Sequence, residues 1–319
     1  MTKGLILGGA RFHGYLLAKY FSEKGDEVYV LNRGNFRNNY PLKIKQIIAD
    51  RNNSQQLKNA LEGFKFDYVI DNNAYTPMQI EIFLNIMKDR IRHYVFTSTA
   101  SVYLNFFSDK SLKENESDGI KKGFISPDIE NYGTNKYLSE MKIKEYDINY
   151  TILRLPNIFG EGDFAGKLTY FNERFKDKRK VLVEQESNFF SLVYAGDLPE
   201  IYDLVLKDEK CFNKVINIAD PEPCDYDSFF SSISNDYSKK NLLFLSAEKI
   251  FELGYSKSFY MGPIVDVSLA KELLNPVFTP INIWGKRTLE WEKNNLNENK
   301  KQEHKIKRIE ELKSIEKLK

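Results

Sequence analysis

Short apolar runs alternate with segments of helical periodicity along the first 160 residues of the chain. The apolar runs have the length of buried strands and lie at residues 4–8, 27–31, 44–49, 68–71, 93–97 and 150–155. Between them, apolar residues recur at helical spacing at 15–21, 54–61, 77–87 and 132–146. Strands that alternate with helices form right-handed β–α–β units, which build a parallel sheet covered by helices on both faces. The pattern therefore predicts an α/β fold with a doubly wound parallel sheet.

The pattern becomes less regular after Gly160. Strand-like runs lie at 180–184, 191–194 and 215–218, and a helical run lies at 226–233, with Pro and Gly between them. We therefore expect a main domain over residues 1–165 and a smaller C-terminal domain over 166–291 that returns some elements to the main sheet. Residues 292–319 form a third part, a charged helical tail.

The tail is rich in Lys, Glu and Asn and carries an apolar residue at every third position, at Ile306, Ile309, Leu312, Ile315 and Leu318. A spacing of three drifts around an α-helix, so these residues do not form the straight seam of a coiled coil. We expect a solvated terminal helix with a partial apolar stripe. A helix that binds a partner or forms an oligomer is the alternative.

The composition of the chain excludes several classes of protein. The chain has 319 residues, of which 42% are hydrophobic, so it can bury a sizeable core. The formal net charge is +2, without the excess of positive charge that holds nucleic acid or an anionic membrane. No segment reaches 18 consecutive apolar residues, and two Cys with three His argue against a disulfide framework or a structural zinc site. We expect a soluble cytoplasmic protein that binds no metal, no membrane and no nucleic acid.

A glycine-rich turn separates the first predicted strand from the first helix, with glycines at Gly8, Gly9 and Gly14. In a dinucleotide-binding fold this turn passes close to the cofactor pyrophosphate, which excludes side chains at particular positions. The free amide groups and the positive dipole end of the following helix then bind the phosphates. The position of the turn between strand and helix therefore predicts a Rossmann-type site for a nicotinamide dinucleotide. A tight turn without a ligand is the alternative.

The residues around the second strand bear on the choice between NAD and NADP. An NAD site usually carries Asp or Glu at the end of this strand, where the carboxylate binds the ribose hydroxyls and repels a 2′-phosphate. This chain has Asn32 and Arg33 there, and Arg11 lies inside the glycine turn. Arginine offers forked donors to a phosphate dianion, so we expect NADP rather than NAD, unless Arg33 only points to solvent. Asp50, after the third strand, is placed either to accept a hydrogen bond from the adenine amino group or to cap the next helix.

A second group of residues has the chemistry for hydride transfer. Thr99 follows the fifth predicted strand, and Tyr132 and Lys136 lie on one face of a predicted helix, one turn apart. A tyrosine with its ordinary pKa of about 10 is a poor base at neutral pH, but positive charge from a lysine and an oxidised nicotinamide favours the tyrosinate. Tyr132 can then take the proton of an alcohol while its hydride leaves, and the Thr99 hydroxyl would hold the same oxygen.

With these residues the sequence resembles the extended short-chain dehydrogenase/reductases of the NAD-dependent epimerase/dehydratase family. The resemblance spans about residues 3–292 and continues past the predicted catalytic helix through 153–160, 192–198, 215–219 and 288–291. It implies that residues 1–165 form an NAD(P)-binding Rossmann domain. It also implies that residues 166–291 form mainly a substrate-binding domain, and it favours a homodimer.

The resemblance assigns roles to single residues. It implies that Thr99, Tyr132 and Lys136 are catalytic, and that Asn157 and Thr99 bind substrate. The implied cofactor-binding residues are Gly8, Gly9, Arg11, Phe12, Gly14, Asn32, Arg33, Asp50, Ala74 and Lys136. From the residues alone, Asn157 could equally cap a turn, and Asp197 is expected to cap or buttress a helix rather than do chemistry.

Two departures from the family pattern limit what the resemblance implies about the substrate. Arg11 replaces the family's middle glycine, and Asp71-Asn72-Asn73-Ala74-Tyr75 replaces the usual His/Leu-Ala-Ala after the fourth strand. Arg11-Phe12 in the glycine turn, together with Asn32-Arg33-Gly34 after the second strand, resembles an atypical branch that includes the chloroplast stem-loop-binding proteins, some of which act on RNA. A third difference concerns the reaction, because the family's dehydratases carry Asp-Glu or Glu directly after the catalytic Thr, whereas this chain has Ala100 and Ser101. Elimination of water is therefore disfavoured.

We therefore expect an NAD(P)-dependent enzyme that acts on a nucleotide-activated sugar. It would be a 4-epimerase or a 4-keto-reductase that uses Tyr132 as proton relay in hydride transfer. The alternative is a non-catalytic NADP-binding or RNA-binding protein of the atypical branch, which would explain Arg11 and the altered loop after the fourth strand. The intact Tyr–Lys pair and the near-zero net charge count against this alternative.

Overall fold

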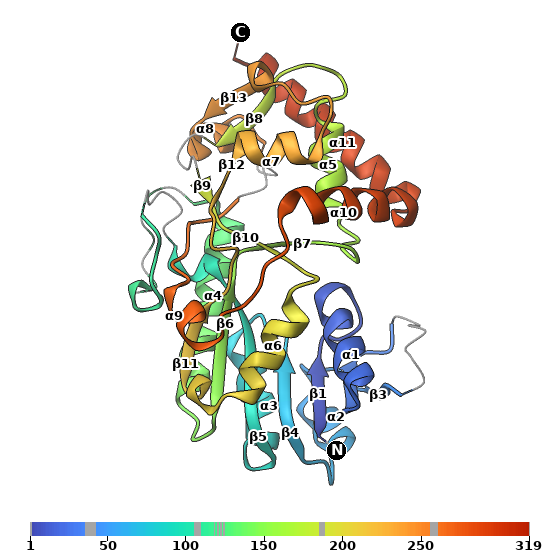
Figure 1. Cartoon of the computed structure of the whole chain (residues 1–319), viewed down its shortest axis with the longest axis vertical. Coiled ribbons are helices and arrows are strands. Elements are labelled where there is room, and N and C mark those ends of the chain that lie inside the picture. Colours follow the sequence, from blue (N-terminus) through green and yellow to red (C-terminus); the bar gives the residue numbers. More distant parts are fainter. Residues whose placement is uncertain are drawn as a thin grey trace.

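Two parts follow each other along the long axis of the molecule, a larger one around a parallel sheet and a smaller one above it (Figure 1). The computed structural model describes residues 2–35, 43–104, 110–117, 119, 121, 123, 125–184, 189–255 and 261–318. The larger part contains the N-terminus, and the smaller part contains the last helices of the chain (Figure 1).

Within the described residues, seven parallel strands form the central sheet in the order β11-β6-β5-β4-β1-β2-β3. They span Lys3–Leu7 (β1), Glu27–Asn32 (β2), Lys45–Ile48 (β3), Phe66–Asp71 (β4), Ile91–Thr99 (β5), Tyr150–Leu155 (β6) and Lys214–Asn217 (β11). The chain runs outward from β1 through β2 to β3 and then returns to the other side of β1 to form β4. The strand order therefore reverses between β1 and β4. In open α/β sheets, ligands bind at this point, beyond the carboxyl ends of the strands.

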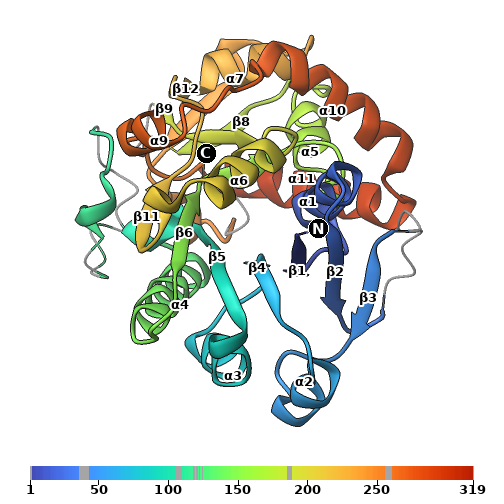
Figure 2. The same cartoon turned by 60° about the horizontal axis from the view of Figure 1, so that its bottom comes forward.

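Helices cover both faces of this sheet (Figure 2). One face carries α1 (Phe12–Lys24), α6 (Leu198–Lys207) and α9 (Ser268–Leu273), and the other carries α2 (Ser54–Ala60), α3 (Pro77–Met87) and α4 (Pro127–Lys144). Alternate strand residues face the two sides, so that Ile6 of β1 belongs to the first core while Leu5 and Leu7 belong to the second. The doubly wound α/β fold predicted from the sequence is confirmed.

Short two-stranded sheets and an aromatic core make up the smaller part. The strand pairs are β7 (Asn157–Phe159) with β10 (Leu192–Tyr194), β9 (Phe189–Phe190) with β12 (Cys224–Asp225), and β8 (Val181–Glu184) with β13 (Leu242–Leu245). The helices are α5 (Lys167–Glu173), α7 (Tyr226–Ile233), α8 (Ala247–Glu252), α10 (Ile281–Asn295) and α11 (Glu298–Glu316). Trp284 of α10 is fully buried and stacks on Phe159 and Tyr194, with ring centroids 6.0 and 5.7 Å apart. The aromatic core therefore joins the end of the chain to the strands β7 and β10.

The C-terminal helix α11 packs differently from the expectation. Ile306 and Ile309 remain 47% and 51% exposed, whereas the polar residues Arg308 and Glu311 are buried. Glu311 accepts hydrogen bonds from the guanidinium of Arg174 and, at 2.8 Å, from the backbone N–H of Leu182. The predicted solvated helix is therefore wrong. The helix docks through charged side chains whose partners lie more than 120 positions earlier in the chain, and the apolar periodicity of the tail carries no information about them.

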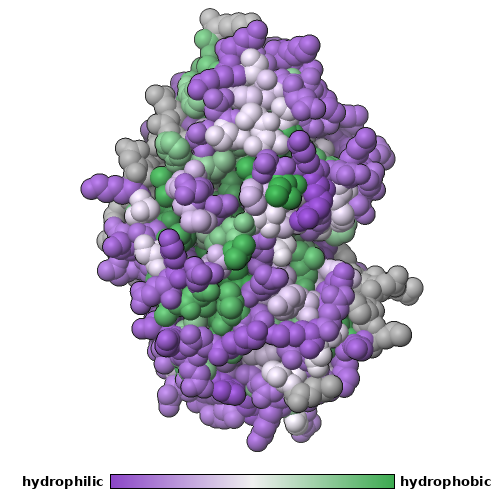
Figure 3. All heavy atoms as spheres, viewed as in Figure 1, coloured by the Kyte–Doolittle hydropathy of each residue, from purple (hydrophilic) through white to green (hydrophobic). Residues whose placement is uncertain are grey.

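The visible surface in Figure 3 is mostly polar, and hydrophobic residues gather across its middle, over α9.

Asp197 begins α6 and holds the segment that follows α9, because its carboxylate accepts hydrogen bonds from the backbone N–H and the hydroxyl of Thr279, at 2.8 and 2.6 Å. The buttressing role expected for Asp197 is confirmed. Among the helices of the described ranges, none combines the length and apolar character needed to cross a membrane.

Candidate functional site

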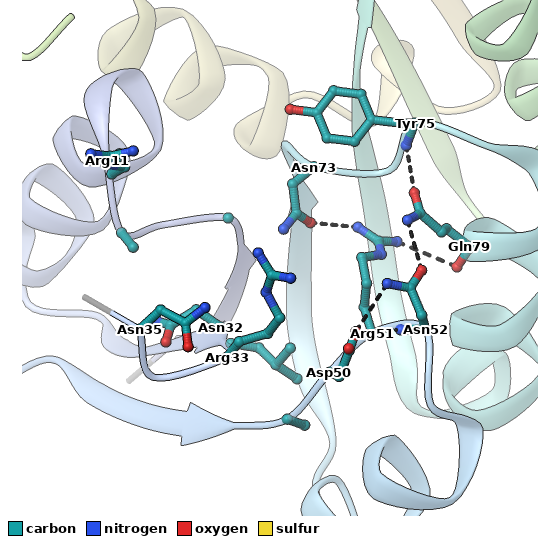
Figure 4. Close-up of a pocket in the computed structure, with 14 residues that line it drawn as sticks. Arg11, Asn32, Arg33, Asn35, Asp50, Arg51, Asn52, Asn73, Tyr75 and Gln79 are labelled. Atoms are coloured by element: carbon teal, nitrogen blue, oxygen red, sulfur yellow. Dashed lines mark hydrogen bonds between the residues drawn. The ribbon is translucent and has the colours of Figure 1, made fainter. Parts of the chain in front are cut away.

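The glycine turn forms one wall of a cavity at the point where the strand order reverses (Figure 4). This switch-point cavity has a volume of about 410 Å³ and is lined by Gly8, Ala10, Arg11, Leu31, Asn32, Arg33, Asn35, Ala49, Asp50, Arg51, Asn52, Asn73, Tyr75 and Gln79. These residues follow the carboxyl ends of β1, β2, β3 and β4. The structure thus brings together five of the residues predicted to bind a cofactor, namely Gly8, Arg11, Asn32, Arg33 and Asp50.

Backbone geometry explains the glycines of the turn. Gly8 has a φ of +84°, a conformation that side-chain-bearing residues rarely adopt. A Cβ atom on Gly14 would overlap the carbonyl oxygen of Gly8, so the first turn of α1 can approach the strand only with glycine at this position. The N-terminus of α1 therefore faces the cavity closely, as a pyrophosphate site requires. A dinucleotide fits this arrangement of residues. Gly9 is buried, and a Cβ there would lie 2.9 Å from Val30.

The end of β2 carries the residues expected to distinguish NADP from NAD. The Asn32 side-chain oxygen accepts hydrogen bonds from the backbone N–H of Gly34 and from the side chain of Gln46, both at 2.8 Å. Arg33 is exposed and lines the switch-point cavity. Figure 4 shows Arg11 apart from Arg33, beside the ribbon of α1. The two guanidinium groups therefore line different regions of the cavity.

Asp50 lines the cavity and does not cap α2. Its carboxylate accepts hydrogen bonds from the backbone N–H and the side-chain amide of Asn52, at 2.9 and 3.0 Å. The N-cap of α2 is Asn53, whose side chain accepts from the backbone N–H of Gln56. Of the two roles open for Asp50, the helix cap is wrong, and the contact with adenine stays a prediction.

A buried ion pair lies behind the cavity, and the sequence did not indicate it. Arg51 donates to both carboxylate oxygens of Asp71, at 2.7 and 2.8 Å, and Asp71 also accepts from the hydroxyl of Tyr94 at 2.7 Å. Arg51 holds the pKa of Asp71 below its usual range even though burial alone would raise it. Arg51 further donates to Asn73 and to the carbonyl of Gln79 (Figure 4). The network holds the loop after β4, in which Asp71 and Asn73 depart from the pattern that the resemblance predicts.

A second cavity contains the residues predicted to do chemistry. This tyrosine cavity has a volume of about 310 Å³ and is lined by Phe12, Thr99, Ala100, Ser101, Ile129, Tyr132, Pro156, Asn157, Ile158, Lys167, Gly262 and Pro263. Thr99 ends β5, Tyr132 lies on α4 and Asn157 begins β7. The glycine turn contributes Arg11 to the first cavity and Phe12 to the second. An extended ligand that crosses this turn can therefore reach both cavities.

Tyr132 lines the tyrosine cavity. The residue is 38% exposed as a whole, whereas desolvation of its hydroxyl, together with the neighbouring Tyr75, raises its pKa to about 12. The hydroxyl of Thr99 acts in the opposite direction and lowers the pKa of Tyr132. Thr99 also contacts Ser101, whose backbone N–H it accepts at 3.2 Å. In this state Tyr132 is a protonated phenol at neutral pH, so additional positive charge is needed to make it a base.

Lys136 lies one helical turn beyond Tyr132 and is almost fully buried. Its ammonium donates hydrogen bonds to the backbone carbonyls of Ala74 and Thr97, at 3.0 and 2.6 Å. Burial lowers its pKa to about 7, although the nearby carboxylates of Asp71 and Glu140 work against this shift. Ala74, predicted to bind cofactor, is itself fully buried, and its neighbours Asn73 and Tyr75 line the switch-point cavity in its place.

Three further residues of the site were not predicted to have a function. Lys167 lines the tyrosine cavity, where it donates to the carbonyl of Ile158 at 2.6 Å. Tyr75 lines the switch-point cavity, and its ring lies 6.3 Å from that of Tyr132. The ring nitrogens of His13 are buried without a hydrogen-bond partner in the described ranges, and burial and two lysines lower its pKa to about 4. The place of His13 in the glycine turn could have indicated it from the sequence, whereas no feature of the sequence indicated Lys167.

Glu292 of α10 anchors the start of α5, beside Lys167. Its carboxylate accepts a hydrogen bond from the backbone N–H of Thr169 at 2.6 Å, and burial raises its pKa to about 7. Because an acid with a raised pKa binds more protons in the folded state, its contribution to stability is complete below about pH 4.5 and is lost as the pH rises through about 7.

We therefore expect the Glu292→Gln variant to lose less stability than the parent protein between pH 5 and pH 8. Urea unfolding of both proteins across this range measures the difference. The exposed neighbour Glu290, changed to Gln, is the matched control and should follow the parent. Parallel curves for Glu292→Gln and the parent would contradict the assignment.

The glycine turn and the Tyr–Lys pair occur in a sequence pattern shared with known proteins. The model of the NAD dependent epimerase/dehydratase family matches residues 4–219, more than half of the chain. The chain belongs to this family. The resemblance to the extended short-chain dehydrogenases of the epimerase/dehydratase family is thereby confirmed. The match begins at β1 and includes all the segments that line the switch-point cavity.

Similarity to individual proteins is more distant for this epimerase/dehydratase family member. The chloroplast stem-loop binding protein of 41 kDa b from Arabidopsis thaliana is 24% identical over 274 residues, which cover 81% of this chain and 69% of the relative. A UDP-glucose 4-epimerase from Thermotoga maritima, solved with UDP-glucose, superposes with a TM-score of 0.73 at 19% identity and covers 92% of this chain and 100% of its own. The enzyme WbmG from Bordetella bronchiseptica, solved with NAD and UDP, has a TM-score of 0.72 at 16% identity over 92% and 94% of the two chains. At these identities the two structures establish the fold.

Proposed function

We propose that the protein is an NAD(P)-dependent nucleotide-sugar enzyme, either a 4-epimerase or a 4-keto-reductase. The observation that carries the proposal is the tyrosine cavity, which is lined by Thr99, Tyr132 and Asn157. The glycine turn lines this cavity through Phe12 and the switch-point cavity through Arg11. The similar structures from Thermotoga maritima and Bordetella bronchiseptica contain UDP-glucose in one case and NAD with UDP in the other, which supports this class of ligands.

The proposed reaction assigns a proton transfer to Tyr132. A bound nicotinamide ring supplies the hydride acceptor or donor at the sugar C4 atom. Tyr132 takes the proton of the 4-hydroxyl when the carbonyl forms and returns it when the carbonyl is reduced. Thr99 donates a hydrogen bond to the same oxygen, and Asn157 orients the sugar. Lys136, one helical turn away, favours the tyrosinate when it is protonated, and because burial lowers its pKa to about 7 this charge is only partial at neutral pH.

The residues beside Thr99 support hydride transfer without elimination. Ala100 and Ser101 line the tyrosine cavity at the positions where the family's dehydratases carry carboxylates. Neither side chain can act as the acid or base that removal of water requires. A 4-epimerase returns the hydride to the opposite face of the same sugar, and a 4-keto-reductase consumes the reduced dinucleotide, so both reactions agree with these residues.

Identification of bound dinucleotide and turnover with nucleotide sugars tests the proposal. The dinucleotide released from the denatured protein is identified first, and the protein is then assayed with UDP-, dTDP- and GDP-sugars. Retained dinucleotide with interconversion of C4 epimers indicates the epimerase, and consumption of added NADPH with a 4-keto sugar indicates the reductase. A preparation that binds neither NAD nor NADP would refute the proposal.

We further propose that the dinucleotide is NADP, because Asn32 and Arg33 end β2 without the carboxylate of an NAD site. The Arg33→Ala variant should bind NADPH about tenfold more weakly, since a charge-assisted hydrogen bond to phosphate contributes about 1.5 kcal/mol or more. Its affinity for NADH should stay unchanged. Fluorescence titration with both dinucleotides measures this, and Arg92→Ala, which changes an exposed arginine paired with Glu209, is the control. Equal losses for NADPH and NADH would assign Arg33 to another role.

A second candidate function, RNA binding without catalysis, is favoured by one observation. The relative from Arabidopsis thaliana is named for stem-loop binding, and it is similar over 81% of this chain. The formal net charge of +2 speaks against a large phosphate-binding surface. A mobility-shift assay with stem-loop RNA at increasing salt distinguishes the two candidates. Salt-dependent binding without any turnover of nucleotide sugars would favour this second function.

A further inference from the structure

The segment that follows β7 and ends at the first residue of α5, residues 160–167, lies against the glycine turn. The guanidinium of Arg11 stacks on the ring of Phe164, with 5.4 Å between the guanidinium carbon and the ring centroid. A Cβ atom on Gly162 would lie 3.4 Å from the Cα atom of Phe12, so the two backbones pass close to each other. Lys167, at the other end of the segment, has its ammonium 5.7 Å from the ring of Phe12. The segment therefore follows the turn from Arg11 to Phe12.

Helices α10 and α11 hold this segment from its other side. The ring of Trp291 packs edge-on against Phe164, with ring centroids 5.3 Å apart. Arg287 pairs with Glu161, and the imidazole of His304 donates a hydrogen bond to the carbonyl of Ala165 at 2.9 Å. Phe164 therefore contacts both Arg11 and Trp291, although the residue is 44% exposed.

The position of Arg11 indicates what its contact with Phe164 does. Arg11 is the N-cap of α1 and lines the switch-point cavity, so it lies where the free N–H groups of the helix face a phosphate. The family pattern has glycine at this position, where the backbone of the turn passes close to the phosphates. The contact with the ring of Phe164 restricts the orientation of the Arg11 side chain, and the forked N–H donors of a guanidinium suit a phosphate. Restriction of the side chain before binding also reduces the entropy lost when the anion binds.

We propose that Phe164 is a positioning residue that holds the Arg11 guanidinium at the glycine turn, where Arg11 binds the pyrophosphate of the dinucleotide. The inference depends on the dinucleotide binding contained in the proposed function. It adds a side-chain cation to the usual backbone site and assigns its orientation to a residue of the C-terminal half of the chain. Trp291 supports the ring of Phe164 from behind.

A double-mutant cycle on the full-length chain tests this inference. Dissociation constants are measured by calorimetry for NAD or NADP, whichever binds the parent protein more tightly. We expect Arg11→Ala to weaken binding about tenfold and Phe164→Ala about fivefold, because a hydrogen-bonded charge contact to phosphate is stronger than a cation–π contact. Phe164→Tyr, which keeps the ring, should bind like the parent. Phe189→Ala, which removes another phenylalanine with an exposed ring, is the control and should also bind like the parent.

The double variant distinguishes positioning from a general structural role. If Phe164 acts through Arg11, then Phe164→Ala has no further effect on affinity in the Arg11→Ala background. A fivefold loss in that background as well would overturn the inference, and so would parent-like binding by Phe164→Ala alone. Both outcomes leave the proposed function intact. A parent protein that binds neither dinucleotide would instead refute the proposed function, and this inference with it.

Discussion

The Tyr132→Phe variant is expected to lower turnover by about 10²- to 10⁴-fold, the usual contribution of a positioned acid or base. The substitution removes one hydroxyl from the tyrosine cavity and leaves the ring in place. The dissociation constant of the dinucleotide should stay close to that of the parent. Steady-state assays with the active nucleotide sugar measure the change in kcat.

A neighbouring tyrosine on the same helix provides the control for this prediction. Tyr137 lies on α4 and packs against the small core around Tyr103, and the structure places it outside the tyrosine cavity. Tyr137→Phe should therefore retain the parent's kcat. If Tyr132→Phe kept turnover near the parent value, the proton relay would have to be assigned to another group. Circular dichroism of both variants verifies that the fold is preserved.

The Glu311→Ala variant is expected to lower the free energy of unfolding by about 3–5 kcal/mol, the usual cost of leaving one member of a buried ion pair without its partner. Glu311 is fully buried, and it accepts hydrogen bonds from Arg174, Arg308 and the backbone of Leu182. Its removal leaves the buried guanidinium of Arg174 with the carbonyl of Leu182 as its remaining hydrogen-bond partner among the described residues. Urea unfolding followed by tryptophan fluorescence measures the loss.

Glu316→Ala is the control for Glu311→Ala. Glu316 is exposed near the end of the same helix, so its substitution should change the free energy of unfolding by less than about 0.5 kcal/mol. A loss of similar size for both variants would mean that α11 contributes through its helical content alone. Parent-like stability of Glu311→Ala would show that Arg174 finds solvent or another partner when the carboxylate is removed.

The central sheet was predictable because its signals are local. Apart from β3, a mostly exposed edge strand, each strand from β1 to β6 contains a buried apolar run, and a parallel sheet with both faces covered requires this pattern. α4 begins at Pro127 rather than near Tyr132, because Pro127 favours the first turn of a helix and Asp128 and Glu130 suit its positive end. The small sheets of the C-terminal half were harder to predict, because each pairs strands that are far apart in the sequence, as β8 with β13.

The candidate site likewise contains residues that could be located from the sequence and residues that could not. The glycine turn, Thr99, Tyr132 and Asn157 could be located because they follow strands or lie on one helix face at recognisable spacing. Arg51 was not recognised, because its meaning depends on Asp71 and Tyr94, which belong to other strands. Periodicity reports which face of an element is buried, but it does not report which charged group meets which. The contacts of a buried charge therefore require coordinates.

The pairing of Arg174 with Glu311 has a consequence for synthesis of the protein on the ribosome. The two residues are 137 positions apart, so Arg174 leaves the ribosome well before its partner Glu311 is synthesised. The strands from β1 to β6 all lie before residue 156, so they can assemble while the rest is still being made. Until Glu311 is synthesised, in contrast, the guanidinium of Arg174 near α5 and β8 lacks the carboxylate with which it pairs in the folded protein. A premature stop codon before residue 298 would make this nascent state permanent, and such a product should be a substrate for chaperones and proteases.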